Sequence, residues 1–397
     1  MTMIQGSVEP GFESVRDAFR ENFEQHGEIG AAVCAWLEGR KVVDLWGGLA
    51  CRKPEKPWRK DEMVLVFSVT KGLMALAFLM LADQGRLDYD APVSAYWPEF
   101  QGAGKEAITV RQLFNHRSGL CAIDRKITTE DLRHHPERVH AALVAQAPLW
   151  EPGSAQGYGA ISLGLYGAEL FRRITGESVG RFFAREVAAP LNVDVHIGLP
   201  ETLEERVARI YPVTIAERLL RTLPEVITGK TPEGRIIRAF LNRNSATARA
   251  FSNPGMGPQG FEIFNDPEIH RMELLWVNAI ATARGLARVY AALAEGGELD
   301  GVRLCSPEIL QGPQERQSWG FDRVLHKEMG FSLGFVKEEP HLFSPNEAAF
   351  GHPGMGGAVG FADPSRRLAF AYVMNRMDRR LRSPRALRLC HALYRAL

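Results

Sequence analysis

A run of ten apolar residues, Leu73 to Ala82 (LMALAFLMLA), limits the possible folds of this chain more than any other feature. The run is too short to cross a bilayer, which takes roughly 20 residues. It therefore predicts a helix that is buried in a core on all sides. The strand-like segment VLVF (64–67) comes shortly before it, so we expect a junction between a strand and a buried helix.

Ser68 and Lys71 occupy that junction, in the tetrapeptide SVTK. Residues three apart on a helix share a face, so the hydroxyl and the amine can come within hydrogen-bonding reach. The positive potential of a helix N-terminus favours an oxyanion and disfavours a protonated lysine. A serine hydroxyl needs such help to act as a nucleophile. The alternative is a capping serine and a solvated lysine, although a solvated lysine would not usually start so apolar a helix.

Tyr158 lies in a loop that Pro152, Gly153 and Gly157 mark before a helix. Its phenol could relay protons, or its ring could pack while its hydroxyl caps the loop. The helix-ending turn at 115–119 (NHRSG) is expected near the same cleft.

The segment 351–357 (GHPGMGG) has four glycines in seven positions. Glycines let a backbone approach a ligand closely and direct N–H groups at it. The segment is therefore either the wall of an oxyanion site or an ordinary glycine-rich hairpin. It is not a phosphate loop, because no Gly-Lys-Ser or Gly-Lys-Thr follows.

Strand-like segments occur at both ends of the chain, and helical periodicity dominates between them. A helix at 12–25 leads into strands at 31–39 and 41–48, and the C-terminal part has strands at 329–336, 348–353, 357–363 and 367–374 before an Arg-rich helix from about 383. Helices are expected at 73–84, 109–115, 128–146, 159–175, 179–187 and 282–296.

If the two ends pair into one sheet, the middle of the chain forms a second lobe, and ligands bind in clefts between lobes. We therefore predict a discontinuous α/β domain made of residues 1–72 and 276–397, and a mainly helical domain over 73–275. Residues 231–275 show little periodicity and are predicted to be an irregular segment that covers a pocket.

Charge and cysteine usage exclude several classes of protein. The chain has 48 Lys and Arg against 47 Asp and Glu, so no overall field favours nucleic acid or an anionic membrane. A small, uncharged substrate is expected instead. Five scattered cysteines lack paired metal-ligand spacing, and we expect no metal and no cofactor. The N-terminus lacks the pattern of an export signal, which favours the cytoplasm. The C-terminal arginines from Arg376 to Arg388 are expected to form a solvated helix face rather than a site for an anion.

Taken together, these segments resemble the serine β-lactamase and penicillin-binding protein superfamily, most closely the class C β-lactamase-like esterases of family VIII. The resemblance spans nearly the whole chain and rests on the joint order of five segments: SVTK at 68–71, ITVRQLFNHRSGL at 108–120, LWEPGSAQGYGAISLGLYGAEL at 149–170, ATARGLARVYAALAEGG at 281–297 and FGHPGMGGAVGFADP at 350–364. It implies an α+β fold, with an antiparallel sheet flanked by helices and a mostly helical lobe.

The resemblance also implies roles for individual residues. Ser68 would be the nucleophile, Lys71 its base and Tyr158 a proton relay, with the backbone N–H groups of Ser68 and Met355 as the oxyanion hole. Which of Lys71 and Tyr158 takes the serine proton stays open at this stage. Four residues near the cleft are expected to contact substrate: His352, Gly354, Gly356 and Trp276.

Two departures from the β-lactamases bear on the substrate. Tyr158-Gly159-Ala160 replaces Tyr-x-Asn, and His352-Pro353-Gly354 replaces Lys-Thr-Gly, so an amide and a permanent cation are missing. Both changes favour uncharged esters over β-lactams. We therefore expect a serine carboxylesterase. The alternatives are a β-lactamase, a D-amino-acid peptidase or an acyltransferase of the same fold, or a catalytically silent scaffold.

Overall fold

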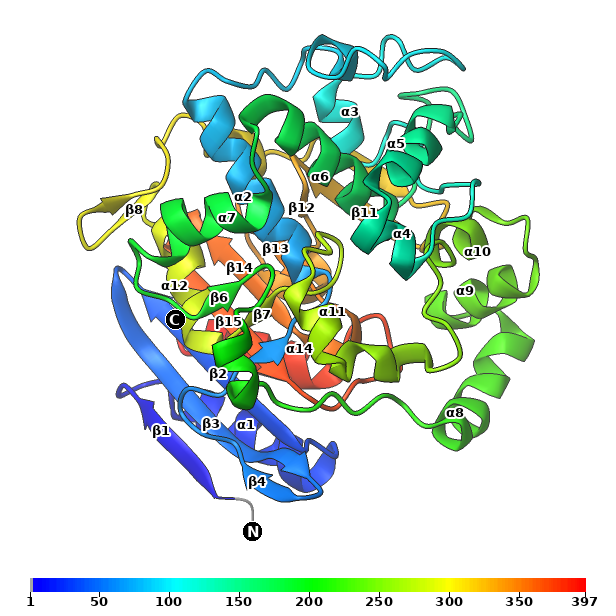
Figure 1. Cartoon of the computed structure of the whole chain (residues 1–397). Coiled ribbons are helices and arrows are strands. Elements are labelled where there is room, and N and C mark those ends of the chain that lie inside the picture. Colours follow the sequence, from blue (N-terminus) through cyan, green and yellow to red (C-terminus); the bar gives the residue numbers. More distant parts are fainter. Residues whose placement is uncertain (1–2) are drawn as a thin grey trace.

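A ten-stranded antiparallel sheet joins the two ends of the chain in this computed structural model, which describes residues 3–397 apart from the side chains of 215–221 and 339–340. Its strands run in the order β1-β3-β2-β15-β14-β13-β12-β11-β10, with β4 beside β3 (Figure 1). Their bounds are β1 (Ile4–Val8), β2 (Gly30–Leu37), β3 (Arg40–Arg52), β4 (Glu55–Pro57), β10 (Ser318–Phe321), β11 (Glu328–Ser332), β12 (Phe335–Val336), β13 (Phe350–Pro353), β14 (Val359–Asp363) and β15 (Leu368–Met374). The predicted pairing of the chain ends is confirmed, because β2 pairs with β15 along its length.

The side-chain pattern of β14 and β15 explains how helices cover both faces of this sheet. Successive residues of a strand point to opposite faces. Small residues such as Gly360 meet α12 (Ala283–Ala294), whose Tyr290 ring lies against that glycine. The aromatic ring of Phe361 points the other way and stacks on Tyr394 of α14 (Pro384–Arg395). Helix α1 (Glu13–Gln25) packs beside α14.

Helix α2 (Val69–Asp83) begins four residues before the predicted start, and every residue from Val69 to Leu81 is buried. The predicted core helix is therefore confirmed. The other helices between the strands are α3 (Val110–Phe114), α4 (Thr129–His134), α5 (Pro136–Ala145), α6 (Ser162–Thr175), α7 (Val179–Phe183) with a π-helical turn at Ala184–Ala188, α8 (Ile215–Thr228), α9 (Pro232–Leu241), α10 (Ala246–Phe251), α11 (Pro267–Arg271) and α13 (Gln311–Gln314).

Short elements complete the chain. A three-stranded sheet forms from β5 (Val64–Leu65), β7 (Ile280–Ala281) and β6 (Val195–His196), and a separate hairpin from β8 (Glu298–Leu299) and β9 (Val302–Arg303). Strand β5 ends three residues before Ser68, so the predicted strand-to-helix junction is also confirmed.

Three expectations about elements were wrong, each for a local reason. The helix expected at 128–146 is broken, since Pro136 keeps His135 out of the helical conformation. The strand expected at 329–336 is a hairpin, because Leu333 and Gly334 form a turn with φ of 41° and 89°. Residues 231–275 are not irregular: they hold α9, α10 and α11. The division into two domains stays a prediction.

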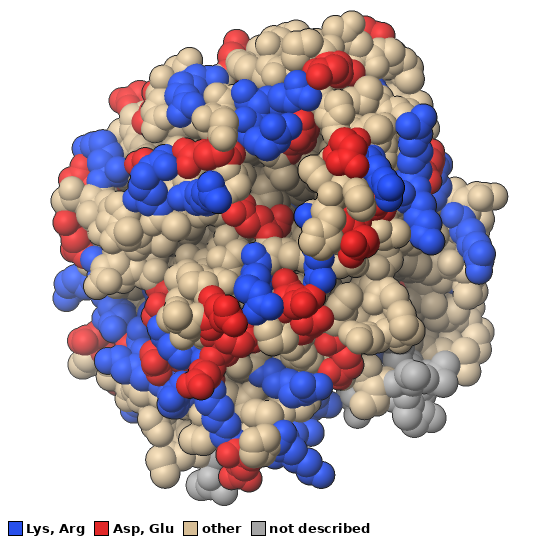
Figure 2. Space-filling model, in the orientation of Figure 1, with Lys and Arg blue, Asp and Glu red and all other residues tan. Residues whose placement is uncertain are grey.

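The C-terminal arginines do not form one solvated face, as the sequence suggested. Arg385 is buried and its Nη1 lies 2.5 Å from Glu28 Oε1, while Arg379 pairs with Glu225 at 2.9 Å. On the face of the molecule shown in Figure 2, Lys and Arg lie interspersed with Asp and Glu. Within residues 3–397, no helix is long and apolar enough to cross a membrane.

Candidate active site

Ser68 and Lys71 are brought together by the first turn of α2. Lys71 Nζ lies 3.2 Å from Ser68 Oγ and donates to the carbonyl oxygen of Trp276 at 2.9 Å. The Lys71 side chain is fully buried, and this burial lowers its pKa well below the usual value. Burial therefore favours the neutral amine, the form that can accept a proton from the neighbouring hydroxyl.

The backbone before Ser68 is held in an unusual conformation. Phe67 has φ of 51°, in the left-handed region that few bulky residues adopt. Thr70 Oγ1 donates to the Phe67 carbonyl at 2.6 Å and accepts from the Ala279 N–H at 2.9 Å. The sharp turn that presents Ser68 is thereby tied to the residue just before β7.

Tyr158 completes the cluster. Its phenol is buried near Ser68, which favours the ionised phenol slightly, and its ring centroid lies 5.1 Å from Lys71 Nζ. Burial raises the pKa of Tyr158 above its usual value, so the phenol stays protonated at neutral pH. The hydroxyl, amine and phenol that the sequence singled out are thus in contact.

The loop that carries Tyr158 is fixed by buried polar contacts. Gln156 Nε2 donates to the carbonyl oxygens of Gly320 and Met329, each at 2.8 Å. The Asp322 carboxylate accepts two backbone N–H groups of its own loop, and the Tyr158 amide also favours its ionised form. Burial outweighs these bonds and raises the pKa of Asp322 to about 6.

His116 is a functional candidate to which the sequence assigned no role. Its Nδ1 accepts the Gly159 N–H and its carbonyl accepts the Gly157 N–H, both at 3.0 Å, so it holds both neighbours of Tyr158. The His116 ring lies 5.0 Å from the Tyr158 ring, centroid to centroid. Burial, and then the positive charge that Lys71 carries when it is protonated, lower the pKa of His116 to about 3, so the imidazole stays neutral.

The glycine-rich turn Met355–Gly357 lies beside the same junction. A Cβ on Gly354 would lie 2.3 Å from the Val66 carbonyl oxygen, so only glycine permits this approach. Gly356 has φ of 87°, which also favours glycine. The placement agrees with an oxyanion wall, while the roles of the Ser68 and Met355 N–H groups stay predictions.

His352 is buried at the end of β13, next to this turn. Its Nδ1 donates to the Pro353 carbonyl at 2.8 Å, which leaves Nε2 as an acceptor, and Nε2 has no partner within the described part of the chain. Burial first, and then Lys71, lower the pKa of His352 well below its usual value. His352 is therefore uncharged. Trp276 meets the cluster through its backbone carbonyl, and contact of its ring with substrate stays a prediction.

A sheet covered by helices on both faces, with a Ser-x-x-Lys sequence at the start of a buried helix, defines the class of protein. The sequence matches the beta-lactamase family over residues 15–393, and the chain belongs to this family. The fold predicted from the sequence, a β-lactamase-like α+β fold, is confirmed.

Individual relatives support the same family assignment. Esterase/beta-lactamase LipL of Mycobacterium tuberculosis (strain ATCC 25618 / H37Rv) is 36% identical over 94% of this chain and 83% of LipL. A crystal structure of a family VIII carboxylesterase superposes with a TM-score of 0.87 at 38% identity, over the full length of both chains. A penicillin-binding protein homologue from Caulobacter crescentus gives a TM-score of 0.86 at 35% identity, also over both full lengths. The protein is thus an enzyme of the serine hydrolase class.

Proposed function

We propose that this protein is a carboxylesterase that hydrolyses small, uncharged esters through an acyl-enzyme on Ser68. The observation that carries this proposal is the cluster at Ser68: the buried amine of Lys71 lies 3.2 Å from Ser68 Oγ and 5.1 Å from the ring centroid of Tyr158, whose phenol is protonated. The names of LipL and of the family VIII carboxylesterase support an esterase among the activities of this family.

In the first step, the lone pair of Lys71 Nζ takes the Ser68 proton while Oγ bonds to the ester carbonyl carbon. An unperturbed lysine would be neutral for under about 0.1% of the time at pH 7, so the burial of Lys71 is essential to this role. The sequence left open whether Lys71 or Tyr158 is the base. The raised pKa of Tyr158 disfavours a phenolate and supports Lys71.

In the second step, the tetrahedral intermediate collapses and the carbon–oxygen bond to the alcohol breaks. Its oxyanion is stabilised by the N–H groups of Ser68 and Met355. Tyr158 gives its phenolic proton to the leaving alcohol and regains one from the Lys71 ammonium. Water then attacks the acyl-enzyme with Lys71 as base, and the departing Ser68 oxygen recovers its proton.

The neutral state of His352 supports an uncharged substrate. A cation at this position would attract a carboxylate, whereas a buried, neutral imidazole offers an acceptor and no charge. Hydrolysis of β-lactams is a second candidate activity, because LipL is named for both activities and is similar over most of its length. We expect it to be the slower reaction, and nitrocefin hydrolysis measures it.

The test is Ser68→Ala, with Ser7→Ala on the exposed edge strand β1 as a matched control. We expect Ser68→Ala to abolish hydrolysis of p-nitrophenyl acetate without lowering the melting temperature, and Ser7→Ala to retain full activity. A fluorophosphonate probe should add one adduct to the peptide that contains Ser68, as read by mass spectrometry. Retention of most activity in Ser68→Ala defeats the proposal.

A further inference from the structure

The amine of Lys71 is held from a second side by the carbonyl oxygen of Trp276. Its Nζ lies 2.9 Å from that oxygen and 3.2 Å from Ser68 Oγ. A neutral amine has two N–H groups and one lone pair, and a carbonyl oxygen can only accept, so one N–H is committed to Trp276. The position of this carbonyl therefore limits where the lone pair can point and how well it meets the Ser68 hydroxyl.

Trp276 lies in the loop between α11 and β7, so neither a helix nor a strand fixes its carbonyl. The N–H groups of Val277 and Asn278 both donate to the Leu274 carbonyl, at 2.8 and 3.2 Å, and close a tight turn around Trp276. These bonds shape the turn but do not attach it to the rest of the molecule. Contacts with side chains must set its position.

Asn278 supplies such contacts. Its side chain is fully buried, and its Oδ1 accepts the Leu274 N–H at 2.8 Å. Its Nδ2 donates to the carbonyl oxygens of Ile269 and Met272, at 2.7 and 2.6 Å. Both N–H groups of the amide are thus used, and they tie the turn around Trp276 to the end of α11. A buried polar network whose members are paired makes the segment that it joins rigid.

Two neighbouring helices also hold this turn. The Ala279 N–H donates to Thr70 Oγ1 of α2 at 2.9 Å, and the Ala279 carbonyl accepts the Val66 N–H at 2.9 Å. Gly164 of α6 lies so close to the turn that a Cβ there would be 2.6 Å from the Trp276 nitrogen. Only glycine at this position leaves the backbone of the turn enough space.

From these contacts we propose that Asn278 is a positioning residue for Lys71: it holds the turn where the Trp276 carbonyl meets the amine, and Gly164 leaves room for that turn. The inference rests on the proposed role of Lys71 as the base. Before proton transfer the carbonyl orients the amine. After transfer it stabilises the ammonium, because a hydrogen bond from a charged donor is stronger than one from a neutral donor.

The test is the pH profile of kcat/KM for p-nitrophenyl acetate in Asn278→Ala. We expect kcat to fall about tenfold with KM unchanged, since the hydrogen bonds of Asn278 position the base and not the ester. The acid limb of the profile should move to lower pH by about one unit, because an ammonium with a poorer acceptor loses its proton more readily. A merely structural role would lower the melting temperature and leave the limb in place.

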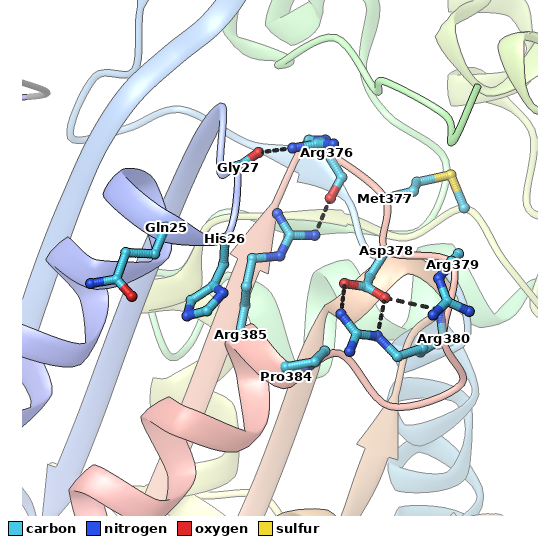
Figure 3. A pocket seen from close by; sticks show the side chains of 10 residues that line it. All are labelled: Gln25, His26, Gly27, Arg376, Met377, Asp378, Arg379, Arg380, Pro384 and Arg385. Carbon is cyan, nitrogen blue, oxygen red and sulfur yellow. Dashed lines mark hydrogen bonds and ion pairs between the residues drawn. The ribbon is translucent and has the colours of Figure 1, made fainter. Parts of the chain in front are cut away.

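Asn375→Ala is the matched control. Asn375 is also a fully buried asparagine, and its side chain accepts the Gly30 N–H at 3.0 Å and donates to two carbonyl oxygens of β3, at 2.9 and 3.2 Å. It directly precedes Arg376, and Figure 3 shows the loop that begins there, between the end of α1 and the start of α14. Its replacement should cost a similar number of hydrogen bonds and leave the acid limb unmoved.

Gly164→Ala perturbs the same turn without removing a hydrogen bond, and it decides the question if Asn278→Ala does not fold. It should move the acid limb in the same direction. Gly167→Ala on the same helix should not, because its Cβ would meet only the flexible end of the Met74 side chain.

The inference is overturned if Gly164→Ala and any folded Asn278→Ala leave the acid limb in place or move it to higher pH, or if Asn375→Ala moves it as far. Ser68→Ala keeps this result separate from the esterase proposal. If Ser68→Ala is inactive and the limb does not move, the inference about Asn278 fails alone. If Ser68→Ala retains most activity, the proposed function itself fails.

Discussion

His116 shows how much of the chemistry at Tyr158 depends on a side chain that is expected to touch no substrate. The peptide N–H groups of Gly157 and Gly159, on either side of Tyr158, both donate hydrogen bonds to His116. One bond goes to the backbone carbonyl of His116 and the other to its ring. The ring contact requires an acceptor at Nδ1, and the low pKa of His116 keeps that acceptor available at any pH near neutrality. His116 is therefore expected to be a positioning residue for Tyr158, the proposed proton donor.

We expect His116→Asn to keep kcat within about tenfold of the unaltered enzyme, and His116→Leu to lower it about a hundredfold. The Asn oxygen replaces Nδ1 as acceptor, and asparagine tolerates the left-handed backbone that His116 adopts at φ of 61°. Leucine fills the space without an acceptor. Steady-state hydrolysis of p-nitrophenyl acetate measures both variants.

His116→Gln is the matched control, because the side-chain oxygen of glutamine lies at the position of Nε2 rather than of Nδ1. This variant should therefore lose as much kcat as His116→Leu. Equal kcat for the Asn and Leu variants at equal melting temperature would show that the bond to Gly159 has no part in catalysis. Sequence reasoning placed this turn near the cleft but could not assign the role, because the contact with Gly159 depends on a side-chain direction that spacing does not reveal.

Asp322 makes the stability of the protein depend on pH. Its pKa is about 6 in the folded chain, against roughly 3.9 for an unfolded aspartate, so the folded state holds the proton more tightly. Between about pH 4 and 6 the folded state therefore binds more protons than the unfolded state, and the free energy of unfolding falls as pH rises. The stabilisation of the folded state that comes from protonated Asp322 is fully present below about pH 4, and it amounts to about 3 kcal/mol at most.

Asp322→Asn removes the titrating group while it keeps an acceptor for the loop amides. Urea unfolding at several pH values from 4 to 7.5 should show the unaltered chain losing stability relative to the variant across this window. The difference between the two chains isolates Asp322 from the other carboxylates. Parallel curves would mean that the carboxylate titrates at its ordinary pKa in the folded chain.

At the scale of elements, the hairpin from β13 to β14 places its turn against the start of α2 because Gly354 has no side chain. A Cβ there would lie 2.3 Å from the Val66 carbonyl oxygen and 3.2 Å from the Ala358 Cβ. The backbone of the turn must then move away from the strand-to-helix junction, and the Met355 N–H moves with it.

We expect Gly354→Ala to lower kcat by about 10²–10³, the usual cost of losing one oxyanion donor. Gly320→Ala is the matched control, since a Cβ on Gly320 in β10 meets no atom within 4 Å among the described residues. It should leave kcat nearly unchanged. Hydrolysis of p-nitrophenyl acetate, with circular dichroism to confirm folding, distinguishes the two variants. Full activity in Gly354→Ala would remove the turn from the mechanism.

The sequence predicted long, strongly patterned elements well and short ones poorly. Helix α2 and the paired strands β2 and β15 follow from periodicity, since apolar spacing over many residues has few alternatives. The short helices at 231–275 have too few turns for a clear period. Their starts were nevertheless marked by N-caps, where Thr231, Ser245 and Asp266 each accept a backbone N–H from their first turn.

At the scale of the whole molecule, the large sheet cannot form until the last part of the chain is present, because β2 and β15 are neighbours. Pairing of the chain ends was predictable, since strands occurred at both ends and helices between them. The burial of Arg385 was not, because the sequence shows the charge of each arginine but not which guanidinium folds inward. Arg385 folds inward to Glu28, between α1 and β2, and so ties the last helix to the start of the sheet.

This buried pair gives a test of how the chain ends hold together. Burial raises the pKa of Glu28 in spite of the guanidinium of Arg385, so the ion pair is costly to bury. The structure tolerates it because the attraction between the two opposite charges offsets this cost. Arg385→Met leaves the Glu28 carboxylate buried alone and should lower the free energy of unfolding by about 3–5 kcal/mol.

The double variant Glu28→Gln with Arg385→Met should recover most of that loss, since no charge remains buried and the introduced amide can still accept the hydrogen bond that Tyr372 donates to Glu28. Arg388→Met, which breaks the more exposed pair between α14 and Glu21 of α1, should cost no more than about 1 kcal/mol. Urea unfolding curves measure all three. If Arg385→Met costs no more than Arg388→Met, the chain ends are held by apolar packing of α1, α14 and the sheet alone, and the buried pair contributes nothing that the surface pair does not.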